Sequence, residues 1–320
     1  MAKRGKKKCV LVVGRGRLPC DVAKALGETG GWGRIELALG EAAPSAPPAH
    51  SLDLLARGAS RRLAQLAADV DPDLVVLLWA SDGPDLPVRS GRFEAAAAEA
   101  VKAGLERWLD GGGRLGGLIA LSSTAVYGVA RTSPLLFNEA SPPAAVATDT
   151  PFGRWVEELR QAESLLSAFG RERSLAVGLL RAATVVAAPS GGSIGAYLDS
   201  TVVLRVAGHD PCLQLLHYRD LVTAIVASCG LNPDGALNIV GRGTVPLSRV
   251  VALAGRLAVP LPAFLARRLA PPALGVERMC WRSLADGRRS LQVLGIEPRY
   301  SSEDALREAV AGRGGDGPGV

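Results

Sequence analysis

The segment CVLVVGRGRLPCDVAKALGET, residues Cys9–Thr29, sets the topology of this chain. Its first residues, Cys9–Gly14, are a continuous apolar run that ends in glycine, which is typical of a buried parallel strand. Residues Asp21–Thr29 follow as a predicted helix with its apolar positions on one side. A strand, a glycine-containing turn and a helix in this order indicate the start of a βαβ unit.

Strands and helices continue to alternate as far as Val186. The predicted strands are Arg34–Leu39, Asp73–Ala80, Leu115–Ser122 and one within Ser174–Val186, and the predicted helices are Ser60–Asp69, Phe93–Asp110 and Phe152–Phe169. This alternation predicts an α/β protein with a parallel sheet covered on both faces by helices. Because such crossovers are right-handed, we expect a doubly wound Rossmann-type sheet.

The alternation loosens after Pro189, where shorter segments indicate a smaller C-terminal subdomain. We expect a basic flexible tail at 1–8, a Rossmann domain at 9–188, the smaller subdomain at 189–311, interleaved with the Rossmann core, and a flexible tail at 312–320. The segments predicted in the smaller subdomain are Tyr197–Val206, Cys212–Leu216, a helix at Arg219–Cys229, Ala236–Val240, a helix at Leu247–Leu257, the proline-punctuated Pro260–Pro272 and a helix at Ser302–Ala311.

The composition, 48% hydrophobic and 21% charged residues, is that of a globular chain with a large core. The net charge of +6 comes partly from a basic head, and no basic run with interleaved aromatics predicts a nucleic-acid surface. The five cysteines are far apart and the three histidines lack ligand spacing, so we expect reduced thiols in a cytoplasmic protein and no metal site. The apolar run Cys9–Val13 is too short for a signal peptide, and no segment predicts a membrane span.

Five segments resemble, in order, segments of one known family. They are LSSTAVYG at Leu121–Gly128, LLRAATVVAAP at Leu179–Pro189, LLHYRDLVTAIVASC at Leu215–Cys229, ALNIVGRGTVPLSRVVALAGRL at Ala236–Leu257 and LGIEPRYSSEDALREAV at Leu294–Val310. Through these segments the chain resembles the extended short-chain dehydrogenase/reductase family, in its NAD-dependent epimerase/dehydratase group. Matches in the right order indicate the fold, whereas function has to be argued from the site residues.

The resemblance implies a cofactor, NAD or NADP, and a nucleotide-sugar-like ligand. It also implies that the smaller subdomain is a lid over the substrate. The helices Phe93–Asp110 and Phe152–Phe169 match the family's dimer helices, so a homodimer is expected. The alternative is a helix pair that only covers the sheet.

A dinucleotide site needs glycines after the first strand, so that the backbone can approach the pyrophosphate closely. The turn GRGRLPC holds Gly14 and Gly16 but no third glycine. The family pattern G-x-x-G-x-x-G places Arg17 and Cys20 at its later positions, and a shifted pattern places Pro19 at the third. Arg17 would either block the pyrophosphate or bind it through its guanidinium. A turn that binds nothing is the alternative.

The resemblance implies further cofactor contacts. At the end of the second strand, where the family carries an acid for the adenosine ribose, the chain has Gly40 followed by Glu41. Asp53, in HSLDLL, matches the family's acid near the adenine. Ala80 and Ser122 are the other positions expected to contact the cofactor.

Hydride transfer in this family needs a serine or threonine, a tyrosine and a lysine four residues after the tyrosine. Ser123 matches the serine, where it either contacts ligand or caps the next element, but Phe152 matches the tyrosine and Val156 the lysine. The last lysine of the chain is Lys102, so no Y-x-x-x-K exists after the serine strand. A free tyrosine, with a pKa of about 10, is a poor base near pH 7. Losing the pair therefore removes proton transfer that typically contributes about 10²–10⁴-fold.

The remaining candidates each have two interpretations. Tyr127 either packs under the site or takes part in it. His217 and Asp220 form either an acid–base pair or the caps of a helix. Arg181 and Arg289 are the expected substrate contacts; the alternatives are anchoring of the sheet edge for Arg181 and surface solvation for Arg289.

The sequence therefore favours an NAD(P)-binding protein of the epimerase/dehydratase type that lacks the tyrosine/lysine hydride chemistry and serves as a sensor, scaffold or partner subunit. One alternative is an enzyme that uses the cleft for a non-redox isomerisation or cyclisation. Another is an active sugar-nucleotide epimerase or reductase with a different base.

Overall fold

A computed structural model describes residues 8–40, 49–78, 93–131, 133–187, 192–269 and 276–313 of the chain. The flexible tails expected at 1–8 and 312–320 fall almost entirely outside these residues. Of the second tail, Gly312 and Arg313 belong to the last helix. None of the described helices is both long and apolar enough to cross a membrane.

The described residues contain a central sheet of seven strands, all parallel. The strands are β1 (Cys9–Gly14), β2 (Arg34–Leu39), β3 (His50–Ser51), β4 (Leu74–Leu78), β5 (Gly117–Ser123), β6 (Ala176–Ala182) and β11 (Gly235–Ile239). Their order across the sheet is β11-β6-β5-β4-β1-β2-β3. From β1 the strand order proceeds through β2 to β3 on one side and through β4 to β11 on the other. This reversal of strand order between β1 and β4 is typical of a doubly wound Rossmann-type sheet, so the expected fold is confirmed.

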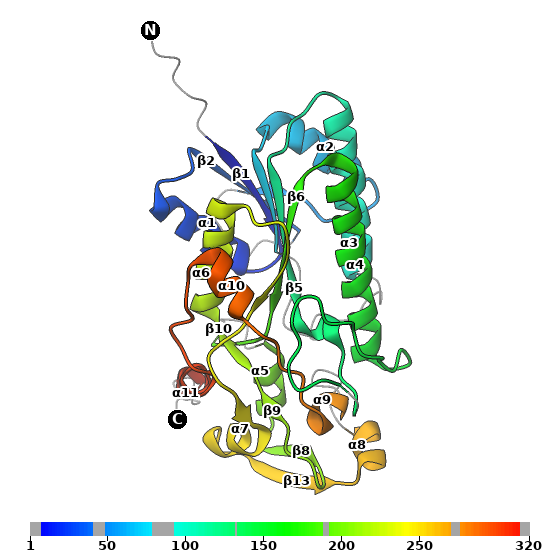
Figure 1. The fold of residues 1–320 in the computed structure, drawn as a ribbon, viewed down its shortest axis with the longest axis vertical. Coiled ribbons are helices and arrows are strands. Elements are labelled where there is room, and N and C mark those ends of the chain that lie inside the picture. The colour runs from blue at the N-terminus through cyan, green and yellow to red at the C-terminus, as the bar shows by residue number, and fades with distance from the viewer. Residues whose placement is uncertain are drawn as a thin grey trace, which may run out of the picture.

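Helices cover both faces of this sheet (Figure 1). The helices α1 (Leu18–Thr29) and α6 (Tyr218–Leu231) lie on one face, and α2 (Ala59–Val70), α3 (Phe93–Asp110) and α4 (Pro151–Arg173) lie on the other. The small residues of α3 allow close packing, since a Cβ on Gly104 would lie 2.8 Å from the carbonyl oxygen of Ser60. The strands β1 and β4 are buried along their whole length, as their continuous apolar sequences predict.

A second, smaller core lies below the sheet in Figure 1 and centres on residues such as Tyr197, Leu215, Leu247 and Met279. The elements around it are β7 (Thr184–Val186), α5 (Gly192–Leu198), β8 (Val202–Val206), β9 (Cys212–Leu213), β10 (Leu215–His217), β12 (Val245–Pro246), α7 (Leu247–Leu253), β13 (Leu257–Leu261), α8 (Ala263–Leu269), α9 (Val276–Cys280) and α11 (Ser302–Arg313). Another helix, α10 (Arg288–Leu294), packs beside β11 of the main sheet.

The structure corrects several predicted boundaries. The helix α1 begins at Leu18 rather than Asp21, because Pro19 is tolerated in a first helical turn. The helix expected at Leu247–Leu257 ends at Leu253, where Gly255 takes a left-handed φ of 63° and starts a new direction. The residues that follow form β13, which pairs in parallel with β8 and was not predicted.

The strand expected within Ser174–Val186 is two strands, interrupted at Ala183. The first, β6, stays in the main sheet, whereas β7 pairs with β10. The segment Tyr197–Val206 likewise divides between α5 and β8. The strand β11 lies in the region assigned to the smaller subdomain but pairs with β6 of the main sheet.

Two carboxyl groups are buried where α3 packs against α4. Glu94 is 5% exposed and Glu158 is 8% exposed. The indole Nε1 of Trp155 donates to Glu94 Oε1 at 2.9 Å, and the backbone N–H of Glu94 donates to Glu158 Oε2 at 3.2 Å. Burial is the main cause that raises the pKa of Glu94 to about 7, and the neighbouring Glu158 contributes to the same shift. Glu94 is therefore protonated in the folded protein below neutral pH.

Replacing Glu94 with glutamine is expected to stabilise the protein at alkaline pH. The raised pKa means that wild-type stability falls as the pH rises from the unfolded value through about 7, because the folded state must then bury a charge. The variant should match the wild type near pH 4 and exceed it by about 1–3 kcal/mol above pH 7. Thermal unfolding between pH 4 and pH 9 measures this. The exposed Glu99 of the same helix is the control, because E99Q should give no such pH trend.

Candidate functional site

The turn after β1 uses both of its glycines. A Cβ on Gly14 would lie 2.6 Å from the carbonyl oxygen of Leu78 and 2.6 Å from Cγ of Pro19, so no other residue fits there. Gly16 has a left-handed φ of 68°, and apart from its chain neighbours Arg15 and Arg17 no described residue has an atom within 4 Å of where its Cβ would be. The buried Pro19 packs against Gly14. The shifted pattern, with Gly14, Gly16 and then Pro19 in the third position, therefore fits the geometry of this turn. The two glycines let a ligand approach its backbone closely.

Arg17 precedes α1, and its side chain contacts Asp21 in the first turn of that helix. Its side chain is 61% exposed, and its Nε lies 3.3 Å from Asp21 Oδ2. Asp21 also accepts a hydrogen bond of 2.8 Å from the hydroxyl of Tyr218 on α6. Blocking of the pyrophosphate by Arg17 and binding of it through the guanidinium both remain predictions.

The carboxyl end of β2 brings together the residues expected near the adenosine. A Cβ on Gly40 would lie 3.6 Å from Cα of Asp53 and 3.5 Å from Cγ of Arg15. Asp53 is exposed, and its Oδ1 accepts the backbone N–H of Leu55 at 3.0 Å. Sequence reasoning did not single out Arg15. Ala80, also expected here, lies outside the described residues.

Ser123 ends β5 and caps the short helix η1 (Thr124–Tyr127), where its Oγ accepts the backbone N–H of Ala125 at 3.2 Å. It also borders a small pocket of about 30 Å³. Phe152, 3% exposed, lines this pocket, whereas Val156 is fully buried and is not among the described residues that line it. The pocket next to Ser123 thus contains a phenyl ring, from the residue that the resemblance matches to the family's tyrosine.

The cation of this pocket comes from Arg278, on α9 of the second core. Its Nη2 donates to Thr184 Oγ1 at 2.5 Å, and its guanidinium carbon lies 5.8 Å from the centroid of the Phe152 ring. At that distance a cation–π attraction holds the guanidinium beside the ring. Arg278 follows a proline-punctuated segment that contains no motif, so sequence reasoning had no signal by which to find it.

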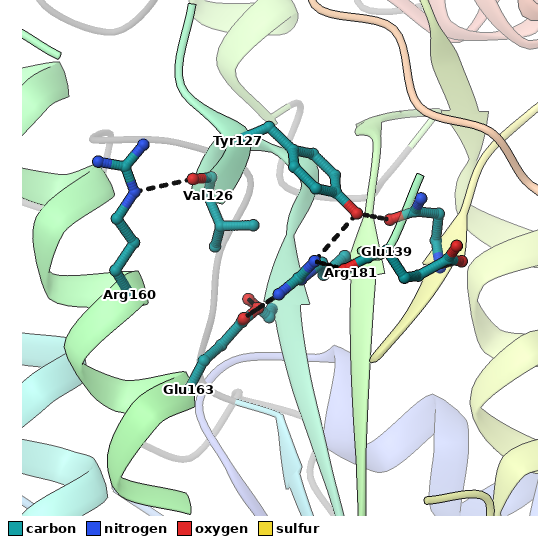
Figure 2. A network of polar contacts seen from close by, with 8 residues as sticks. Val126, Tyr127, Glu139, Arg160, Glu163 and Arg181 are labelled. Carbon is teal, nitrogen blue, oxygen red and sulfur yellow. Dashed lines mark hydrogen bonds and ion pairs between the residues drawn. The ribbon is translucent and has the colours of Figure 1, made fainter. Parts of the chain in front are cut away.

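Ser122, Arg181 and Tyr127 belong to a separate network of polar contacts (Figure 2). Glu163 on α4 accepts the hydroxyl of Ser122 at 2.6 Å and pairs with Nη2 of Arg181 at 2.6 Å. Arg181 Nη1 donates to the Tyr127 hydroxyl at 3.0 Å, which in turn donates to Asn238 Oδ1 at 2.7 Å. Arg181 therefore ties the carboxyl end of β6 to α4, and the buried Tyr127 packs against this network. The cofactor contact of Ser122 and the substrate contact of Arg181 remain predictions.

The remaining candidates, His217, Asp220 and Arg289, do not line the pocket of Ser123. His217 caps α6 through its Nδ1, which accepts the backbone N–H of Arg219 at 3.0 Å. Asp220 accepts the backbone N–H groups of Arg299 and Tyr300, each at 3.1 Å. The structure therefore gives both residues the capping and anchoring interpretation. Arg289 is exposed, and its guanidinium lies by Gly235, at the amino end of β11. The structure does not bring Arg289 to the Ser123 pocket.

No family model matches the chain. Among curated proteins, it is similar to uncharacterized proteins of Mycobacterium tuberculosis and Mycobacterium bovis, each 28% identical over 209 residues. The similar region covers 62% of this chain and 54% of each relative. The chain thus spans about half the length of the curated relatives it matches.

Solved structures match almost the whole chain. A dTDP-glucose 4,6-dehydratase of Bacillus anthracis in complex with NAD has a TM-score of 0.70 at 14% identity, over 97% of each chain. A UDP-glucose 4-epimerase of Thermotoga maritima with UDP-glucose has a TM-score of 0.69 at 16% identity, over 94% of this chain and 97% of that one. A UDP-glucuronic acid 4-epimerase of Bacillus cereus, in complex with UDP-glucuronic acid and NAD, has 0.66 at 14%, over 94% and 98%.

The chain has the fold of these epimerases and dehydratases. At such identities the likeness establishes the fold, and the chemistry must be argued from the side chains of this particular cleft.

Within this epimerase/dehydratase fold, the chain has four tyrosines, and none of them lines the pocket of Ser123. Burial raises the pKa of Tyr127 and Tyr218, and raises that of Tyr197 to about 12. A phenol that serves as a base near pH 7 needs the opposite shift. The hydroxyls of the other two tyrosines are also engaged outside the pocket. That of Tyr197 donates to the Leu204 carbonyl at 2.7 Å, and that of Tyr300 accepts from Arg219 Nη1 at 3.3 Å.

Proposed function

We propose that this protein binds a nicotinamide dinucleotide across the carboxyl edge of its sheet, next to a nucleotide-sugar-like ligand, and does not carry out the usual hydride transfer. One observation carries the proposal. At the pocket of Ser123, the phenol and ammonium positions hold the buried Phe152 and Val156, and no tyrosine reaches the pocket. The sugar-nucleotide ligand is proposed from the epimerases of the same fold that were solved with UDP-sugars.

The described residues fit the phosphate end of a dinucleotide. Gly14 and Gly16 allow the backbone at the start of α1 to approach a pyrophosphate, and Pro19 fills the helix–strand contact that a third glycine would otherwise allow. Asp53 and Gly40 would lie by the adenosine. A bound dinucleotide would supply a hydride acceptor or donor near Ser123, but the described lining contributes no phenol with a lowered pKa to move the accompanying proton.

A protein of this kind would act through binding, as a sensor, scaffold or partner subunit. We further propose that it forms a homodimer through α3 and α4, the helix pair on one face of the sheet.

The second candidate function is a non-redox reaction, such as a cyclisation or isomerisation. The observation that favours it is the polar lining around Arg278 and Thr184, which would hold an anionic substrate group beside Ser123.

Mass spectrometry of small molecules released from native protein, together with thermal shifts in NAD(H) and NADP(H), tests the binding. We expect at least one dinucleotide to raise the unfolding temperature. G16V should abolish the shift, because the side chain would fill the opening over the turn. G30V is the matched control, since Gly30 has nearly the same φ, 66°, and equally open surroundings at the other end of α1. Absence of any bound or stabilising dinucleotide would contradict the proposal.

A further inference from the structure

We infer that the protein has a further small-molecule site, apart from the pocket of Ser123, which takes a ligand with an apolar body and one anionic group. The site is a cavity of about 510 Å³ between α6, α10 and the segment 295–299 that follows α10. The two helices lie side by side (Figure 1). The described linings of this cavity and of the Ser123 pocket share no residue, so the inference does not depend on dinucleotide binding.

The cavity has the size of a ligand site. Protein interiors are close-packed and contain few voids larger than a water molecule, whereas sites for small molecules measure about 300–1,000 Å³. The backbone beside this cavity is tightly packed, because a Cβ on Gly287 would lie 2.6 Å from Cγ2 of Val240. Both residues line the cavity, so α10 approaches β11 closely at this point and the open space does not come from loose packing there.

One wall of the cavity is apolar. Leu216 of β10, Ile239 of β11 and Val240, which follows β11, line it and are each at most 8% exposed. Ala224 of α6 and Leu294 of α10 are buried residues of the same lining. Because these side chains carry no polar group, the wall would remove the apolar body of a ligand from water without leaving a donor or acceptor unpaired.

The cations of the cavity are three exposed arginines, Arg242, Arg288 and Arg299. Arg288 is already paired, since its Nη2 lies 2.7 Å from Asp286 Oδ2. Nη2 of Arg242 donates to the carbonyl oxygen of Arg299 at 2.8 Å, which holds that guanidinium beside the segment 295–299. Among the residues that the structure describes, none pairs with the guanidinium of Arg299. Arg299 is therefore the cation that is available to bind an anionic group.

The acids of the cavity oppose an anion only weakly. Asp286 is paired as described, and Asp220 accepts two backbone N–H groups, so the charges of both are compensated. Glu297 is 67% exposed, and its Oε1 lies 3.9 Å from Nη1 of Arg242. An exposed pair at that distance contributes little, so an anionic group beside Arg299 gains charge-assisted hydrogen bonds and displaces only this weak contact.

Photolabelling and titration calorimetry with 4-benzoylbenzoate test the inference on the full chain. This probe has an apolar aromatic body, a carboxylate, and a ketone that couples to nearby C–H groups under ultraviolet light. We expect saturable binding, and peptide mass spectrometry should place the label within α6 or within residues 286–299. The uncharged 4-benzoylbenzamide should bind about tenfold more weakly, because it cannot form the charge-assisted hydrogen bonds.

A pair of variants on α10 tests the apolar part of the site. Leu291 lines the cavity and is 45% exposed, so L291W should fill part of it and weaken probe binding at least about fivefold. V293W is the matched control. Val293 lies on the same helix and is 39% exposed, but it is not among the described residues that line the cavity, so its affinity should equal that of the wild type.

Variants of the charged residues test the anionic part. R299M should weaken the benzoate about tenfold and leave the benzamide unchanged, whereas E297Q should strengthen the benzoate. R307M is the control, because Arg307 is a 56% exposed arginine of α11 that pairs with Glu303 outside this lining. The inference is overturned by the absence of saturable binding up to about 1 mM, by a label elsewhere in the chain, or by wild-type affinity of L291W or R299M.

Discussion

Replacing Arg181 with methionine is expected to lower the free energy of unfolding by about 3–5 kcal/mol, the usual loss when one member of a buried ion pair is removed. The side chains of Arg181 and Glu163 are only 15% and 10% exposed. Burial alone would lower the pKa of Arg181, but the pairing with Glu163 outweighs it and raises that pKa. Without the guanidinium, Glu163 keeps only the Ser122 hydroxyl among its described partners, and Tyr127 loses a donor.

Urea unfolding followed by circular dichroism measures this loss, and R173M is its matched control. Arg173 pairs with Asp110 at 2.6 Å, the same distance as the Arg181–Glu163 pair, but their side chains are 31% and 63% exposed. An exposed pair of this kind is worth at most about 1 kcal/mol. Equal stability of R181M and R173M would show that the polar network of Arg181, Glu163 and Tyr127 does not anchor β6.

Replacing Val156 with lysine is expected to destabilise the protein by roughly 4 kcal/mol or more. Val156 is fully buried in the main core, so an ammonium there would lose its hydration. Burial lowers the pKa of a lysine, so the unfolded state binds more protons than the folded state. By linkage, the stability of V156K should then rise with pH, and the loss should be greatest in acid.

V156M separates the charge from the added bulk, because methionine is long and uncharged and should cost less than V156K without the pH trend. Thermal melts of both variants between pH 6 and pH 10 make the comparison. A V156K protein as stable as V156M at every pH would show that the side chain reaches solvent in the cleft. In that case, F152Y combined with V156K would be a feasible restoration of the missing pair.

The main sheet was predictable because its strands are buried on both faces and therefore read as continuous apolar runs, as in CVLVVG of β1. The elements within residues 257–294 were not predicted, and β13 shows why. The strand β13, with the sequence LAVPL, is apolar but exposed over most of its length, and Pro260 is unfavourable in a strand, so its sequence does not identify it as one. The break at Ala183 depends on which partner strand each half finds, and a single sequence does not reveal that.

The site was predictable where one residue type is dictated by backbone geometry or by a motif. Gly16 needs its positive φ, and Phe152 and Val156 follow from the spacing of a helix. Arg15 and Arg278 were missed because their positions depend on tertiary contacts, with Phe93 and with Thr184 respectively. Arginines are common in this chain, and nothing in the local sequence separates these two from the others.

The decisive measurement is turnover of protein supplied with NAD⁺ or NADP⁺ and a panel of UDP-glucose, UDP-glucuronic acid and dTDP-glucose. Epimerised or dehydrated product is followed by chromatography, and reduced nicotinamide by absorbance. Without a phenol and an ammonium to transfer the proton, rates should fall about 10²–10⁴-fold below the roughly 1–10³ s⁻¹ of ordinary enzymes. Interconversion of any of these sugar nucleotides within that ordinary range would contradict the account.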